Sequence, residues 1–495
     1  MGMVRNAVLM SIFGAGNTTD VIISTFNVPN SLRKLMAEGG LSAAFIPVFS
    51  RSVATGDKKD HRLLNSLITF QIMLISLICV FAIIFAKPLI TAILTEFKEP
   101  EQIKLAVVMF RWFISYILLI SLSATFMGVL NSNEIFVIPA LTPLIFSFTV
   151  IPSLIFLHAY IGPYALVVGV LTGGLGQIMF QLPSIFRCGY SPKPVLDFRY
   201  EEFMEVMKRW GPVVLTSSVM IINQTVATRF ATGLGEGSAT ALNNAIIFWQ
   251  VPFGMITASI GTVLFPKMSK QAAAKDFKGF GESVSYGIRF LLLMLIPSMI
   301  GYLLFGKQIV AVIFLDGKYT IENVIKTNTV LRGYTAGLLF AGLFNFLQRP
   351  LYSMGKYRFT FYVSIIICSI DIILSVILKS TSLKVSGLAY ANSIAYTSGS
   401  IIYLVYIRTR LCRIPLRPVI YTGLKTVVPG AVITSIILLF NRYMKGWWTE
   451  GRTIGNFSVL MVFTAVLISI VFALYYAEKE DIIITMIKRK SGTKL

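Results

Sequence analysis

The chain has 495 residues, of which 55% are hydrophobic and only 13% are charged. Soluble domains carry about a quarter charged residues, so a water-soluble globule is excluded, because this chain could not cover its surface with polar groups. The net charge is +22, but the basic residues lie between long apolar runs, which indicates a membrane protein with basic loops rather than a nucleic-acid-binding protein. The 4 scattered cysteines and 2 histidines predict no metal site.

The predicted elements are helices long enough to cross a bilayer, which takes about 20 apolar residues. A short apolar stretch at 2–13 precedes a more polar helix at 20–50, which Pro29 and Gly39-Gly40 interrupt. Twelve apolar spans follow, at 63–86, 104–130, 137–158, 163–186, 210–233, 240–265, 286–306, 328–348, 359–378, 384–407, 418–440 and 454–477. The sequence contains no P-loop, nucleophile elbow or HExxH motif, and its loops are short, so we expect no catalytic residue and no enzyme.

The basic residues predict the orientation of the chain. If the chain starts in the cytoplasm, the loops and tail on that side hold 25 Lys and Arg, and the opposite loops hold far fewer. The positive-inside rule therefore places both termini in the cytoplasm. Because that requires an even number of crossings, the stretch 2–13 counts as a truncated first span, and the total is fourteen.

The chain contains a weak internal repeat. FIPVFSR at 45–51 resembles LFPKMSK at 264–270, and two weaker matches have nearly the same offset. An offset that covers six helices gives two copies of the same orientation, which is a parallel repeat. We therefore predict a six-helix lobe at 1–190, a second at 191–412, two further helices at 413–478 and a basic cytoplasmic tail at 479–495. The same offset predicts that the first helix lacks its initial turns.

Ionisable side chains gather in the first two predicted helices, where contact with lipid would be costly. The cluster consists of Arg5, Asp20, Arg33, Lys34 and Glu38. We therefore expect these side chains to line a cavity. Two or three guanidinium groups converging there would suit a phosphate, whose oxygens they bind in a bidentate manner.

Simpler interpretations of the same residues stay open. Arg5 could flank the membrane, Asp20 could cap the helix that starts beside it, and Glu38 could neutralise a neighbouring basic residue. Gly39-Gly40 could be a hinge or a close-packing point.

A second polar group lies in the later spans. Asp371 and Ser375 are one helical turn apart in an apolar run, and Asn392 lies in the next span. An acid with two neutral oxygens could hold a sodium ion or a proton. A hydrogen-bonded packing contact explains the same residues slightly better.

Short motifs along the whole chain resemble the MurJ/MviN family of lipid II flippases. The N-terminal block reads GMVRN at 2–6, FGAG at 13–16, TD at 19–20, PN at 29–30, LR at 32–33, AEG at 37–39 and SAAFIP at 42–47. Further matches are GVLN at 128–131, IPA at 138–140, GP at 211–212, GT at 261–262, FP at 265–266 and DGKYT at 316–320.

The resemblance implies an all-α polytopic transporter of the MOP (multidrug, oligosaccharidyl-lipid, polysaccharide) type, with two six-helix lobes and two extra helices. It implies export of lipid II across the bacterial cytoplasmic membrane by alternating access, with membrane lipids and cell-wall synthesis proteins as further partners. Arg5 and Arg33 match cavity arginines that meet the diphosphate, and Asp20 and Glu38 match acidic positions of the gate or arginine network. No cofactor is implied, but Na⁺, H⁺ or the membrane potential could drive transport.

The sequence departs from the family pattern in two respects. The arginine of the first family motif falls before Met1, and Ile247 stands where the eighth helix usually has an arginine, with Gln250 at a common acidic position. Arg229 or Arg332 could substitute.

Other functions also fit the chain. The alternatives to a lipid II flippase are another MOP exporter, either a polysaccharide-lipid flippase or a cation-coupled drug exporter, and a non-transporting cell-wall scaffold. A membrane glycosyltransferase is a weaker alternative, because no acidic pair lies beside a substrate loop.

Overall fold

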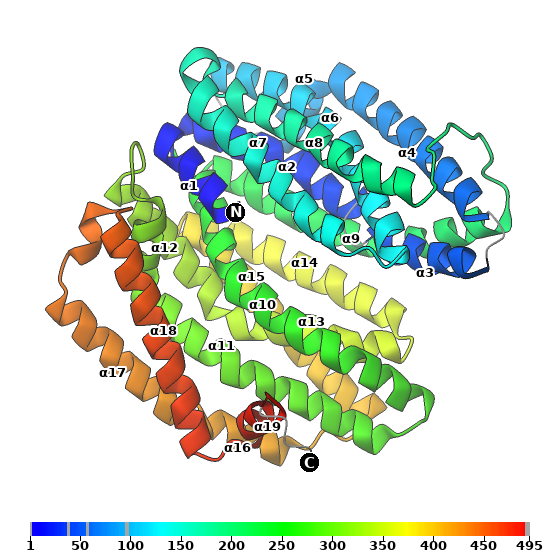
Figure 1. Ribbon diagram of the computed structural model, residues 1–495. Helices are drawn as coiled ribbons and strands as arrows, with labels where there is room; N and C mark the ends of the chain where they lie inside the picture. Colours follow the sequence, from blue (N-terminus) through cyan, green and yellow to red (C-terminus); the bar gives the residue numbers. More distant parts are fainter. Residues whose placement is uncertain (1, 37–39, 56–58, 95–98, 491–495) are drawn as a thin grey trace. The chain divides into compact units, whose positions relative to one another are not determined.

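The computed structural model describes residues 2–36, 40–55, 59–94 and 99–490, and every regular element in these ranges is helical (Figure 1). For residues 33–36, 40–43, 54–55, 59, 212–213, 215–217, 220 and 486–490 it describes the backbone alone. The chain forms two compact units, residues 1–240 and 241–495. The predicted lobe boundaries at 190 and 412 rest on the sequence repeat and stay predictions.

In its described residues, the first unit contains nine helices and the start of a tenth. They are α1 (Gly2–Phe13), α2 (Asn17–Met36), α3 (Gly40–Thr55), α4 (Lys59–Ile84), α5 (Ala86–Ile93), α6 (Pro100–Ser132), α7 (Val137–Ile161), α8 (Tyr164–Arg187) and α9 (Glu201–Thr232). Helix α6 is central, because it packs against α2, α3, α4 and α8. Helices α2 and α3 also pack against α9, which ties the two ends of the unit together.

The second unit begins within α10 (Ser238–Ala273). Its other helices are α11 (Phe277–Phe314), α12 (Ile321–Ala336), α13 (Leu338–Ser353), α14 (Tyr357–Lys379), α15 (Val385–Tyr406), α16 (Leu416–Lys425), α17 (Val427–Tyr443), α18 (Ile454–Ala477) and α19 (Asp481–Lys490). A π-helical turn, Ile407–Leu411, follows α15, and a 3₁₀ turn, Trp447–Glu450, lies between α17 and α18. Helix α11 packs against α12, α13, α16 and α17, so it is the spine of this unit.

The helices agree with a multi-pass membrane protein. Among the described residues, 9 helices are long and apolar enough to span a bilayer, and a bent pair, α12 and α13, makes a tenth. Helices α2, α9 and α15 belong to the fold without passing that test, because they carry many polar side chains; the predicted total of fourteen includes all three.

The prediction of one continuous helix at 328–348 is wrong, because the structure has two helices there with a bend between them. Helices α12 and α13 meet at Gly337 with a bend of 47°. A β-carbon at Gly337 would lie 2.5 Å from the side-chain oxygen of Ser393 in α15, so the absence of a side chain allows this close approach. The hydropathy pattern could not reveal the bend, since it depends on the contact with α15.

The segment between α8 and α9 is strapped along α4 in the first unit. Its backbone N–H groups donate to Asn65 Oδ1 at 3.0 Å and to Thr69 Oγ1 at 2.8 Å. Arg62 Nε donates to Asp197 Oδ2 at 2.8 Å, and this hydrogen bond lowers the pKa of the Asp197 carboxyl. Both side chains are substantially exposed, so the ion pair contributes little stability and mainly fixes the path of the linker.

Candidate functional site

Arg5 lies on the face of α1 that packs against α7. Its side chain is half-buried, and its guanidinium carbon lies 5.2 Å from the centre of the Phe146 ring. Such a cation–π contact stabilises the charge without neutralising it. Arg5 is therefore held against α7 within the first unit.

Asp20 links the starts of two helices that are 220 residues apart in the sequence. Its side chain is 3% exposed, and Oδ2 accepts from the backbone N of Gly237 at 2.7 Å. Oδ1 accepts from the backbone N of Thr240 at 2.7 Å and from Thr240 Oγ1 at 2.6 Å. The carboxylate thus caps the first turn of α10, where free N–H groups and the helix dipole favour an anion. The sequence suggested that Asp20 could cap the helix that starts beside it, which is α2. Its carboxylate instead caps α10.

A second carboxylate makes the reciprocal contact, and sequence reasoning missed it. Glu236, in the turn before α10, accepts from the backbone N of Asn17 at the start of α2 at 3.2 Å. Gly237 has φ +73°, and a β-carbon there would lie 2.5 Å from the carbonyl oxygen of Ala15. The two turns therefore interlock, and the only signal in the sequence is that their separation matches the repeat offset.

The remaining residues of the predicted charged cluster are placed only in part. Arg33 lies in the last turns of α2, where the structure describes the backbone alone, and the same holds for Lys34. Glu38 and Gly39 lie outside the described residues, and Gly40 is the first residue of α3. The predicted roles of these residues stay predictions.

Helix α2 presents a polar stripe to α9, immediately before Arg33 in the sequence. With the end of α5, the two helices line a narrow, partly open crevice. Its polar lining residues are Ser24, Asn27, Ser31, Gln224, Thr225 and Thr228, and its apolar ones are Val28, Ile93 and Leu94. Ser24 is fully buried, and its hydroxyl has no hydrogen-bond partner. The stripe explains why α2 carries so few apolar residues for a helix of a membrane protein.

The structure brings Asp371, Ser375 and Asn392 together between α14 and α15. Ser375 Oγ donates to Asp371 Oδ1 at 3.3 Å, and Asn392 Nδ2 donates to Asp371 Oδ2 at 2.7 Å. The Asp371 side chain is 4% exposed. Within the described ranges, no group of three or more His, Cys, Asp or Glu residues could hold a metal ion, so any cation here would rely on one carboxylate and neutral oxygens.

The second departure from the family pattern, at Ile247 and Gln250, lies in α10. Ile247 is half-buried and Gln250 is exposed, and the two arginines considered as substitutes, Arg229 and Arg332, are both exposed. The predicted span at 328–348 ends just before Arg349, but this residue lies in α13 with its guanidinium directly against Gly261 of α10. A β-carbon at Gly261 would be 1.9 Å from an Arg349 nitrogen, so any side chain there would displace this half-buried guanidinium from its present position.

Comparisons with known proteins identify the family of the chain. The family model described as "Lipid II flippase MurJ" matches residues 9–458. A probable lipid II flippase MurJ of Borreliella burgdorferi is 32% identical over 475 residues, which covers 96% of this chain and 93% of that protein. The lipid II flippase MurJ of Burkholderia cenocepacia is 28% identical over 360 residues, covering 71% of this chain and 70% of that protein.

Solved structures show the same fold. The inward closed conformation of a lipid II flippase MurJ superimposes with a TM-score of 0.78 at 24% identity, covering 99% of this chain and 96% of that chain. An inward-facing multidrug resistance MATE transporter of the MOP superfamily gives a TM-score of 0.70 at 14% identity, covering 83% and 94%. Since the family model spans most of the sequence, the chain belongs to the MurJ family of lipid II flippases.

Proposed function

We propose that this chain moves lipid II from the inner to the outer leaflet of the bacterial cytoplasmic membrane, by alternating access, to supply cell-wall synthesis. The observation that carries the proposal is the family match over residues 9–458, together with a relative 32% identical over nearly its full length. The multi-pass helical fold provides the apolar exterior that a membrane transporter needs. Both termini lie in the cytoplasm in this proposal, because the basic loops then obey the positive-inside rule.

In this mechanism the first unit supplies the contacts to the diphosphate. Arg5 lies over Phe146, and Arg33 lies near the end of the helix that carries the polar stripe. Guanidinium groups bind phosphate oxygens through paired hydrogen bonds, so the two arginines would recognise the head group while the polyprenyl chain stays in lipid. Gly39-Gly40 would bend as the lobes rock. Glu38 would compete for the arginine side chains, or a cation would move at Asp371, and either step would weaken the contact to the diphosphate for release outside.

Depletion in a host bacterium tests the function. In a strain depleted of its own flippase, expression of this chain is expected to restore growth and to restore cleavage of lipid II by a hydrolase added outside the cells. An inactive chain carried on the same vector is the control. Restored growth without outer-leaflet lipid II would favour the scaffold alternative and contradict the transport proposal.

The buried Asp371 group would couple transport to a cation. To bind the cation, the Asn392 amide must turn its oxygen toward the ion. In the structure the amide has the opposite orientation, because its nitrogen donates a hydrogen bond to Asp371. A ligand present at 100 times its Kd stabilises a folded protein by about 2.7 kcal/mol.

We therefore expect NaCl to raise the thermal unfolding temperature of the purified chain relative to choline chloride, and Asp371→Asn to abolish this difference. Asp316→Asn, which removes an exposed carboxylate in the same unit, is expected to retain it. Equal stabilisation of the parent and Asp371→Asn by Na⁺ would contradict a sodium site at this position.

A further inference from the structure

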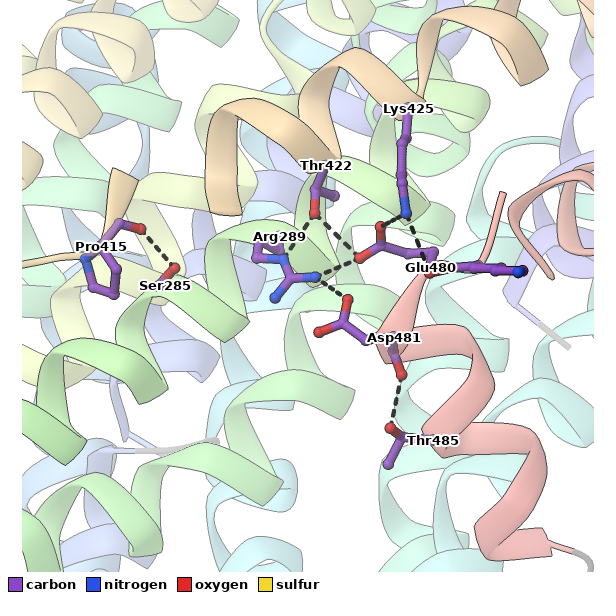
Figure 2. Close-up of polar contacts among 9 residues, drawn as sticks. Ser285, Arg289, Pro415, Thr422, Lys425, Glu480, Asp481 and Thr485 are labelled. Carbon is purple, nitrogen blue, oxygen red and sulfur yellow. Dashed lines mark hydrogen bonds and ion pairs between the residues drawn. The ribbon is translucent and has the colours of Figure 1, made fainter. Parts of the chain in front are cut away.

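The last helices of the chain meet α11 in a cluster of charged residues. Figure 2 shows Arg289 of α11, Thr422 and Lys425 of α16, and Glu480 and Asp481 at the start of α19 converging on one point. All five belong to the second unit, and the residues that meet are up to 192 positions apart in the sequence.

Glu480 is the centre of this cluster. It is 0% exposed, and its Oε1 accepts from an Arg289 guanidinium nitrogen at 2.5 Å and from Thr422 Oγ1 at 3.1 Å. Its Oε2 lies 3.2 Å from Lys425 Nζ, as an ion pair. Arg289 Nε donates to Thr422 Oγ1 at 2.7 Å, and Arg289 also pairs with the more exposed Asp481. Two cations therefore face two carboxylates, and one of those carboxylates is completely buried.

The backbone at the end of α18 places Glu480 in that position. The N–H of Glu480 donates to the carbonyl of Tyr475 and that of Lys479 to the carbonyl of Tyr476, both at 3.0 Å, which is the Schellman pattern of a helix C-terminus. Lys479 occupies the left-handed position with φ +53°, which glycine usually takes. Its carbonyl oxygen accepts from Lys425 Nζ at 3.2 Å, so the strained turn is held by the same cluster.

Contacts along the rest of the C-terminal pair, α17 and α18, are mostly apolar. The pair packs on α11 through Leu293, Ile433 and Val471, and Tyr475 OH donates to the carbonyl of Leu293 at 3.1 Å. At the other end, Arg452 donates its backbone N–H to the carbonyl of Leu315 at 2.9 Å and forms an exposed ion pair with Asp316.

The membrane makes the polar contacts decisive. Apolar side chains of a helix are solvated by lipid tails about as well as by another helix, so apolar packing alone holds two helices together weakly. A buried carboxylate between two cations behaves differently, because its removal takes away the ion-pair partner of Lys425 and leaves Arg289 with the more exposed Asp481. The attachment of the pair to α11 therefore depends on the Glu480 end more than on the long apolar interface.

We propose that Glu480, with Arg289, Thr422 and Lys425, is an ionic latch that fastens the C-terminal helix pair to α11, and that opening the latch releases α16 and the pair while the rest of the chain stays folded. The latch adds a buried charged contact to the neutral hydrogen bonds that α11 forms with Tyr475 and Asn441 of the pair. The latch goes beyond the proposed transport activity, and its test does not require transport.

A native cysteine reports on the latch. Cys412, just before α16, is 7% exposed, and the segment that carries it lies against Gly281 of α11, where a β-carbon would be 2.2 Å from the carbonyl oxygen of Arg413 and 3.7 Å from the Cys412 sulfur. Burial raises the pKa of the Cys412 thiol to about 11, so little reactive thiolate is present at pH 7.5. Release of α16 from α11 would expose this thiol.

The experiment uses the purified full-length chain in detergent, with Cys79, Cys188 and Cys368 replaced by serine, and measures the initial rate of labelling by a water-soluble maleimide. Glu480→Gln is expected to raise the rate at least tenfold, and Glu480→Asp, which keeps the charge on a shorter side chain, is expected to raise it less. Asp316→Asn, the matched control at the other end of the pair, is expected to change it less than twofold.

A second reporter separates local release from unfolding. A version that keeps only Cys79, a 7% exposed thiol of the first unit, is expected to label at the parent rate with and without Glu480→Gln. Labelling of Cys412 at the parent rate in Glu480→Gln would overturn the latch. Equal acceleration at Cys79 and Cys412 would overturn it too, because the effect would then be global.

Discussion

Replacing Arg33 by alanine is expected to abolish complementation of a flippase-depleted strain while the protein still inserts into the membrane. A hydrogen bond to a charged group contributes about 1.5–3 kcal/mol, so loss of a bidentate contact to the diphosphate weakens substrate binding on the order of 100-fold or more. The measurement is colony formation after depletion, with an immunoblot of the membrane fraction as the expression check.

Two variants sharpen this result. Arg33→Lys keeps the charge without the planar fork, so we expect partial growth. Arg62→Ala removes an exposed arginine that pairs with Asp197 on the surface of the first unit, and full growth is expected because such pairs contribute little. Full growth with Arg33→Ala would contradict a role for this guanidinium in transport.

The second large effect concerns stability rather than transport. Asp20→Ala is expected to lower the free energy of unfolding by about 3 kcal/mol or more, because three donors in the first turn of α10 lose a buried charged acceptor. The thermal unfolding temperature in detergent, followed by the fluorescence of the native tryptophans, is expected to fall by about 3–6 °C.

The reciprocal contact supplies the control for Asp20. Glu236→Gln removes the charge of an exposed carboxylate that accepts one backbone hydrogen bond, so its effect is expected to stay below about 1 kcal/mol. Asp20→Asn keeps one acceptor oxygen and is expected to fall between the two. An unfolding temperature unchanged by Asp20→Ala would show that the cap on α10 is not a structural requirement.

The sequence predicted the helices because the bilayer imposes a simple rule on them. A span needs a continuous apolar run, and that run is visible without knowledge of its neighbours. The same logic anticipated that Asp371 and Asn392 would meet, since they lie on consecutive helices joined by a short connection. The proposed function, and the proposed role of Arg5 and Arg33 in binding the diphosphate, came from the family motifs and not from helical periodicity.

Only the tertiary structure decided which distant residues meet. The contacts of Asp20 with Thr240, of Arg349 with Gly261 and of Arg289 with Glu480 join positions 220, 88 and 191 residues apart. The bend at Gly337 likewise depends on a serine in another helix. Hydropathy and helical periodicity indicate only whether each segment, taken alone, favours lipid, water or the protein interior. A pairing across the fold depends instead on which helix faces which, and that is settled when the helices pack.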